Sequence, residues 1–209
     1  MKRRRSFRNF ACAMSWFLPA LLLCAAAGAD EWDARSHFGW GKQQATLAGA
    51  YAIGFGAFGS EGTDAADVEF GALLPNWGIG ISNGLGDSFY RGSFSFHIEP
   101  QLLWNHEPNK GDAYGGGILI RYNLWAHRRF VPFIEGGAGF MGVDFDLINQ
   151  RDGFNFLLQG GVGAHFFLTD RTALLAGWRY HHMSNAGTRH PNVGINANLF
   201  QFGVTYYFD

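Results

Sequence analysis

His182 and Ser184, separated by a single residue, form the pair in this sequence best suited to chemistry. An imidazole within hydrogen-bond reach of a serine hydroxyl can take its proton and produce a nucleophile for acyl transfer. On a β-strand, residues i and i+2 lie about 6.8 Å apart on one face, which permits that approach. A bare His-x-Ser is common in proteins, so the prediction depends on the element that carries the pair and on its surroundings.

The segment 172–184 has the pattern of a β-strand. Its even positions lead to His182 and Ser184 through an apolar face, whereas its odd positions include Arg179 and His181. A period of two, with one apolar and one polar face, is typical of a strand. The segment therefore predicts that His182 and Ser184 share the apolar face. The residues before them on that face are Leu174, Ala176, Trp178 and Tyr180.

Seven further segments show a similar alternation, and the last has the aromatic face typical of the C-terminal strand of outer-membrane proteins. Each is long enough to cross a membrane as a tilted strand, which needs about 9–11 residues. Together they predict an all-β protein, an eight-stranded antiparallel transmembrane β-barrel of the bacterial outer membrane. The seven segments are 44–56, 67–81, 90–104, 114–124, 130–143, 154–168 and 197–208.

Alternation does not say which face points inward, and a soluble lipocalin-like barrel is the alternative architecture. Lysine is scarce, because only Lys42 and Lys110 follow the N-terminal segment. Charged residues recur on the polar faces, and a small barrel can bury them only as a paired internal network. These features favour an apolar exterior with an interior filled by side chains. The charged residues expected inside are Arg91, Glu99, Arg121, Glu135 and Arg179.

The expected connections alternate in length. Segments 83–87, 126–129 and 169–170 are short, whereas 59–66, 106–112, 144–153 and 185–196 are longer. Outer-membrane barrels have short periplasmic turns and longer outer loops. We therefore expect odd-numbered strands to run outward, which puts His182 and Ser184 at the outer rim, level with the leaflet that holds lipopolysaccharide.

The N-terminus predicts export from the cytoplasm. Basic residues from Lys2 to Arg8 precede an apolar run that ends in Ala27-Gly28-Ala29, a small-x-small cleavage pattern. We therefore expect residues 1–29 to be a removed signal peptide and residues 30–209 to form the barrel. A lipoprotein anchor at Cys24 is the alternative, but Leu23 precedes it where such sites require a small residue. Cysteine chemistry is not expected, because Cys12 and Cys24 both lie in the removed segment.

Other ligand classes find little support. Residues 30–209 hold 11 Lys and Arg against 17 Asp and Glu, a net charge of −6, which does not favour nucleic acid. Two G-x-G-x-x-G runs, at 54–59 and 137–142, do not open a helix as a dinucleotide site requires. We expect no cofactor.

The eight histidines raise the question of a metal site. The nearest approach to a cluster is His181, His182 and His190, but adjacent strand residues point to opposite faces, so the first two do not readily share an ion. His97, His165 and His181 fit the polar interior better. We therefore expect no metal.

The segment around the pair resembles a known family. His182-Met183-Ser184-Asn185-Ala186-Gly187, followed by Pro191-Asn192-Val193-Gly194-Ile195, is similar to the signature of the lipid A 3-O-deacylase (PagL) family of outer-membrane barrels. The resemblance implies a carboxylic ester hydrolase that removes an acyl chain from lipid A of lipopolysaccharide with a serine, a histidine and an acid on the lipid-facing exterior. By position, it implies Ser184 as nucleophile and His182 as general base.

The resemblance also implies roles for three asparagines. Asn185 and Asn192 match asparagines of the motif and are candidate donors to the oxyanion, although a turn-forming role suits Asn185 equally. Asn196 stands where the family has its acid. An asparagine can orient the histidine by accepting its other N–H, but it cannot stabilise the imidazolium by charge.

The departure at position 196 leaves alternatives open. Asp144 or Asp146, in the loop after the fifth strand, could supply an acid at the same membrane level. The chain could instead be a non-catalytic barrel with a structural or adhesion role. The sequence also leaves open which acyl chain is cleaved and whether the protein is a monomer or a homodimer.

Overall fold

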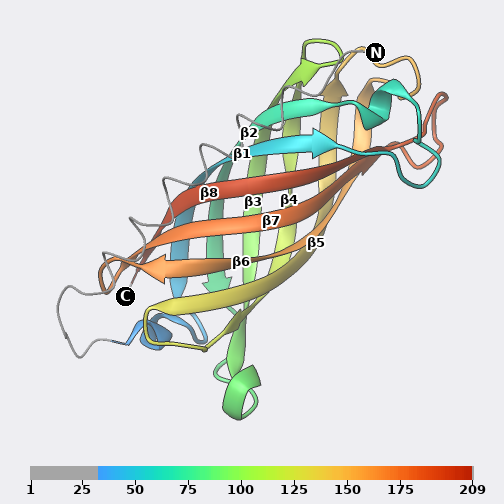
Figure 1. Cartoon of the computed structure of the whole chain (residues 1–209). Helices are drawn as coiled ribbons and strands as arrows, with labels where there is room; N and C mark the ends of the chain where they lie inside the picture. The colour runs from blue at the N-terminus through green and yellow to red at the C-terminus, as the bar shows by residue number, and fades with distance from the viewer. Residues whose placement is uncertain (1–32, 209) are drawn as a thin grey trace. The chain divides into compact units, whose positions relative to one another are not determined.

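The computed structural model describes residues 33–208, and its eight antiparallel strands close into a barrel in the order β1 to β8 (Figure 1). The prediction of an eight-stranded barrel is confirmed. The expected signal peptide, with Cys12 and Cys24, lies outside the described residues. The strands are β1 (Gln43–Gly54), β2 (Glu69–Gly80), β3 (Gly92–Glu107), β4 (Gly111–Leu124), β5 (Phe130–Asp144), β6 (Gly153–Phe167), β7 (Thr172–Ser184) and β8 (Ile195–Tyr207).

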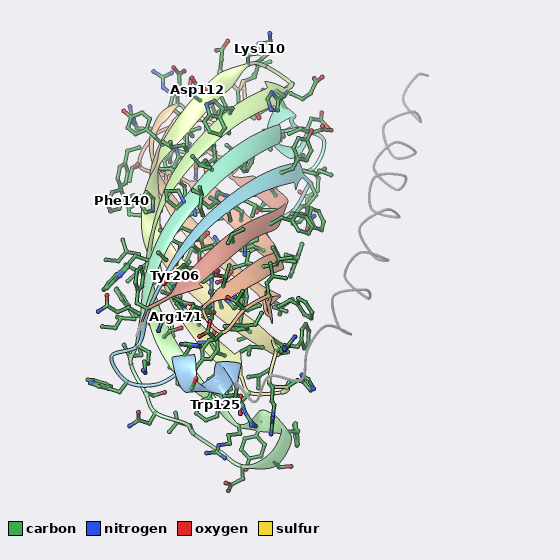
Figure 2. The ribbon with its side chains drawn as sticks, turned by 90° about the vertical axis from the view of Figure 1, so that its left-hand side faces the viewer. Lys110, Asp112, Trp125, Phe140, Arg171 and Tyr206 are labelled. Atoms are coloured by element: carbon green, nitrogen blue, oxygen red, sulfur yellow. The ribbon has the colours of Figure 1, made fainter. Side chains whose placement is uncertain are left out.

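The apolar faces of the strands form the outer surface of the barrel. Ile134, Phe140 and Phe202 are each more than half exposed, while their neighbours along each strand face inward or are less exposed. Figure 2 shows Phe140 and Tyr206 projecting from the outside of the wall. A large exposed apolar surface is stable only in contact with lipid or a partner. The prediction of an apolar exterior is confirmed, and the lipocalin-like alternative is wrong.

The barrel interior contains a buried ion-pair network. Arg179 lies 2.6 Å from Glu99 and 2.9 Å from Glu135, and Arg121 lies 2.9 Å from Glu135. Each charged group therefore has a partner of opposite sign, which buried charges require. The interior positions predicted for these four residues are confirmed. So are those of His97, His165 and His181, each of which is fully buried.

Arg91 was also expected in this interior network, and that prediction is wrong. The short 3-10 helix η4 (Ser88–Tyr90) ends at Arg91, and β3 begins one residue later, at Gly92. Arg91 is therefore exposed, and its guanidinium lies 5.2 Å from the ring centroid of Trp125. The strand begins at Gly92, two residues later than the alternation predicts.

Two connections differ in length from the expectation. The β2–β3 connection spans residues 81–91, because it contains η4, whereas β3 and β4 are joined by residues 108–110 alone. Both strands pair as far as Asn105 and Gly111, which shortens the loop expected at 106–112. The connections β1–β2 (55–68), β5–β6 (145–152) and β7–β8 (185–194) all lie at one end of the barrel. We call this end the site end.

The opposite end of the barrel is filled by the segment before β1. The 3-10 helix η2 (Ala34–His37) is capped by the Asp33 side chain. Phe38, which follows it, packs edge-on against Phe167 and Tyr207 inside the barrel. The interior at this end is therefore closed by aromatic side chains. Among residues 33–208, no helix is long and apolar enough to cross a membrane.

Candidate active site

His182 and Ser184 lie on the outer face of β7, at the site end of the barrel. Ser184 is the last residue of the strand, and both side chains are partly exposed, whereas His181 and Met183 between and beside them are buried inside. His182 Nε2 lies 3.2 Å from Ser184 Oγ. The structure thus brings the predicted pair within hydrogen-bond distance, with the geometry of a nucleophile beside its base.

Asn196 lies directly across from His182, on β8. Residues paired in this way have Cβ atoms about 4.5–5.5 Å apart, so their side chains can meet. His182 Nδ1 lies 2.7 Å from Asn196 Oδ1. Because an amide oxygen only accepts, Nδ1 carries the proton and Nε2 keeps a lone pair for the Ser184 hydroxyl. This tautomer is the one that a general base needs.

The Asn196 side chain is itself fixed at all its hydrogen-bonding positions. Its Nδ2 donates to the Ala57 carbonyl oxygen and to Ser60 Oγ, both at 3.1 Å. Its Oδ1 also accepts from the Tyr180 hydroxyl at 2.6 Å. Although it belongs to the outer face, Asn196 is fully buried, because the β1–β2 connection that contains Ala57 and Ser60 covers it. Two acceptors on the nitrogen keep the oxygen turned toward His182.

A neutral amide thus occupies the position beside His182 where an acid was expected. Within residues 33–208, no carboxylate lies within ion-pair distance of His182. Nothing in this region joins Asp144 or Asp146 to the histidine, and the backbone N–H of Asp146 is bound by Asp152. The same region contains no group of three His, Cys, Asp or Glu side chains that could hold a metal ion.

The two other candidate asparagines have different surroundings. Asn192 Oδ1 accepts from the Asn185 backbone N–H at 2.9 Å and from Gln150 Nε2 at 3.1 Å. Asn185 is buried, and its own side-chain nitrogen donates to the Arg189 carbonyl oxygen at 2.9 Å. The Asn185 amide is therefore used inside the β7–β8 connection, whereas Asn192 is held by its oxygen and keeps its NH₂ group for another acceptor.

Gln150 joins two connections at the site end. Besides binding Asn192, this fully buried glutamine accepts the Gly194 backbone N–H at 2.9 Å through its Oε1. Gly194 has a positive φ of 79°, and a Cβ at this position would lie 2.9 Å from His182 Cε1. A side chain there would be strained and would push against the imidazole. Gln150 and Gly194 thus shape the loop around His182.

Three residues of the site were not anticipated: Ser60, Gln150 and Tyr180. Tyr180 shares the strand face of His182, and its ring stacks on the imidazole with centroids 6.2 Å apart. The strand alternation placed Tyr180 on this face but did not indicate its hydrogen bond to Asn196. Ser60 and Gln150 come from connections 136 and 42 residues away from the groups they bind. No local pattern in the sequence indicates such contacts.

Comparisons with known proteins identify the family of this chain. The family model for lipid A 3-O-deacylase (PagL) matches residues 27–205. A lipid A deacylase PagL from Bordetella bronchiseptica is 27% identical over 158 residues, which cover 63% of this chain and 83% of that protein. The crystal structure of the outer membrane enzyme PagL superposes with a TM-score of 0.50 at 17% identity, covering 77% of this chain and 97% of that one, so it supports the fold. The chain therefore belongs to the lipid A 3-O-deacylase (PagL) family of outer-membrane ester hydrolases.

Proposed function

We propose that this protein removes an ester-linked acyl chain from lipid A through Ser184 and His182. Ser184 Oγ attacks the ester carbonyl while His182 Nε2 takes the hydroxyl proton. The tetrahedral intermediate then expels the sugar oxygen, which receives that proton from the imidazolium. Water, activated by the same nitrogen, hydrolyses the acyl-serine and releases a fatty acid. The 3.2 Å contact between the two side chains supports the first of these steps.

Asn192 is the residue that we assign to the oxyanion. Its Oδ1 is held by Gln150 and by the Asn185 backbone, so its NH₂ group is directed away from both. A donor fixed in advance costs no reorganisation when the negative charge develops. Asn185 supports this donor through its backbone, and its side chain is occupied elsewhere.

Asn196 has the role of the third catalytic member in a neutral form. It fixes the Nδ1–H tautomer of His182, as the acid does in a charged triad, but it stabilises the imidazolium only through a dipole. Ser60, Ala57 and Tyr180 keep its amide in the required orientation. The site is therefore complete in geometry and weaker in electrostatics than one with a carboxylate.

The location of the pair suits a substrate that remains in the membrane. An ester in the outer leaflet approaches the barrel from the side, so a reactive group inside the barrel would not reach it. The outer face of β7 carries Trp178 and Leu174 below the pair, which offers an apolar surface for acyl chains. We place the site end at the outer leaflet, where the longer connections are expected.

One observation carries the proposal: Ser184, His182 and Asn196 form a continuous hydrogen-bonded series on the outer face of two paired strands. A fluorophosphonate probe tests it, because such probes label only activated serines. We expect labelling of the wild-type protein in detergent micelles and none of Ser184→Ala or His182→Ala. The control is Ser88→Ala, an exposed serine in η4 at the opposite end, which should label normally. Equal labelling of Ser184→Ala and wild type would contradict the proposal.

A further inference from the structure

Two exposed arginines, Arg151 and Arg189, lie in the two connections that meet beside the catalytic pair. Residue Gln150, next to Arg151, forms a β-bridge with Asn192. The Arg151 backbone N–H donates to the Pro191 carbonyl oxygen at 2.9 Å, which joins the β5–β6 connection to the β7–β8 connection. Both guanidinium groups are therefore carried by the same loop pair that holds Asn192.

The Arg189 side chain is directed toward the start of β6. A Cβ on Gly153 would lie 2.6 Å from Arg189 Nη2, so the guanidinium covers this glycine. Phe156, three residues further along β6, pairs with Ser184. At about 3.4 Å per residue, the guanidinium lies about 10 Å beyond Ser184 toward the site end. The Asn185 amide holds the Arg189 backbone on both sides, donating to its carbonyl oxygen at 2.9 Å and accepting its N–H at 3.4 Å.

Neither arginine is neutralised by a carboxylate of the described residues. No ion pair within residues 33–208 involves Arg151 or Arg189. Two acidic side chains of the site-end connections are engaged with backbone: Asp152 accepts the N–H groups of Phe145 and Asp146, and Asp64 accepts those of Ile148 and Asn149. Two arginines without an ion pair are thus carried by loops that a backbone hydrogen bond joins, and such groups attract an anion.

We infer that Arg151 and Arg189 bind a phosphate group of the lipid A headgroup and thereby place the ester on Ser184. This inference rests on the proposed role of Ser184. Lipid A is a phosphorylated glucosamine disaccharide, so its phosphates lie on the headgroup side of the sugar-linked esters. The Arg189 guanidinium, which covers Gly153, likewise lies on the headgroup side of Ser184, and Arg151 stands two residues before this glycine. Arginine is suited to this role because its planar fork donates two parallel hydrogen bonds to phosphate oxygens.

The test compares lipid A with lipid A whose phosphates have been removed, each in detergent micelles. With the phosphorylated substrate, we expect Arg151→Gln and Arg189→Gln each to raise KM about tenfold, the size of one charge-assisted hydrogen bond, with little change in kcat. Wild type should show a higher KM for the dephosphorylated substrate than for the phosphorylated one. On the dephosphorylated substrate, the arginine variants should have the same KM as wild type. Lysine at either position should give an intermediate KM, because it keeps the charge without the fork.

Lys110→Gln is the matched control, because Lys110 lies at the same end of the barrel in the β3–β4 connection, on the far side of the ring from β7 (Figure 2). It should leave KM unchanged for both substrates. The inference is overturned if wild type has the same KM for both substrates, or if the arginine variants raise KM equally on both. Ser184→Ala separates failure of this inference from failure of the proposed function. If Ser184 is the nucleophile, this variant loses activity on both substrates, whatever the arginine variants show.

Discussion

Two hydrogen-bonded polar clusters lie on opposite faces of the same strand, β7. The interior cluster contains four formal charges, with Arg179 bound to Glu99 and Glu135 and Arg121 bound to Glu135. The exterior cluster contains Ser184, His182 and Asn196 and has no carboxylate. On this strand the buried charges thus have partners of opposite sign, whereas the exterior cluster is built from an amide, an imidazole and a hydroxyl group.

The solvation of a charge in lipid does not by itself explain this difference. An arginine or lysine on the lipid face costs about 2–4 kcal/mol at the midplane but only about 0–1 kcal/mol near the interface, where the site lies, and acidic residues cost less. The local hydrogen bonds give a stronger reason. Asn196 Nδ2 faces the Ala57 carbonyl oxygen, which needs a donor, so a carboxylate oxygen there would meet another acceptor. The loop over Asn196 is therefore built for an amide.

Removal of the base should have the largest effect on the exterior cluster. We expect His182→Gln to lower kcat by about 10⁴-fold or more, because the serine then lacks its proton acceptor. The free energy of unfolding should change little, since His182 is partly exposed. The control is His190→Ala, which changes an exposed histidine of the β7–β8 connection and should keep full activity. Near-normal turnover by His182→Gln would show that another group acts as base.

Disruption of the interior cluster should have the opposite pattern. Glu135→Leu leaves Arg121 and Arg179 without a shared partner, so we expect a loss of about 3–5 kcal/mol in the free energy of unfolding, measured in urea. The kcat of the folded fraction should stay near that of wild type. Asp87→Leu, in the exposed β2–β3 connection, should change stability by less than about 0.5 kcal/mol. A large loss of kcat in folded Glu135→Leu would mean that the two clusters are coupled.

The oxyanion donor should rank next. Asn192→Ala removes the NH₂ group and is expected to lower kcat by about 10²–10³-fold, the usual effect of losing one such donor. KM for lipid A should change little, because the donor acts mainly on the developing charge. Gln150→Leu, which releases the Asn192 oxygen, should lower kcat by a smaller factor. A rise in KM with unchanged kcat in Asn192→Ala would assign this residue to ground-state binding.

Introduction of a charge into the exterior cluster should have the smallest effect. A charged acceptor strengthens a hydrogen bond by about 1.4 kcal/mol, so Asn196→Asp is expected to raise kcat about tenfold. It should also lower the free energy of unfolding by about 1–3 kcal/mol, because the Ala57 carbonyl oxygen loses its donor. Kinetics and urea unfolding on one preparation measure both effects. A fall in kcat would show that the amide is the better partner for His182 in this loop.

The strand pattern predicted most of the barrel because side-chain direction alternates along every strand. It placed Arg179 inside and His182 and Ser184 outside on β7. It failed at Arg91, where η4 interrupts the alternation one residue before β3 begins. The loop predicted at 106–112 was too long, because polar residues near Lys110 indicate a loop even where the backbone continues to pair.

The site was predictable only in part. The roles suggested for Asn192 and Asn196 came from a resemblance to a family motif, because cross-strand pairing between β7 and β8 cannot be read from one strand alone. Ser60 and Gln150 act through loop contacts over long separations, and such contacts depend on how the connections fold over the rim. The structure shows how an asparagine at position 196 is held in place, which the motif alone leaves open.

The central claim is that Ser184 cleaves an acyl ester of lipid A on the outer face of the barrel. Its most direct test is mass spectrometry of lipid A after incubation of lipopolysaccharide with purified wild type or Ser184→Ala in the same detergent. We predict that wild type yields a species lighter by one acyl chain together with the free fatty acid, and that Ser184→Ala yields neither. Identical spectra from the two proteins would contradict the account.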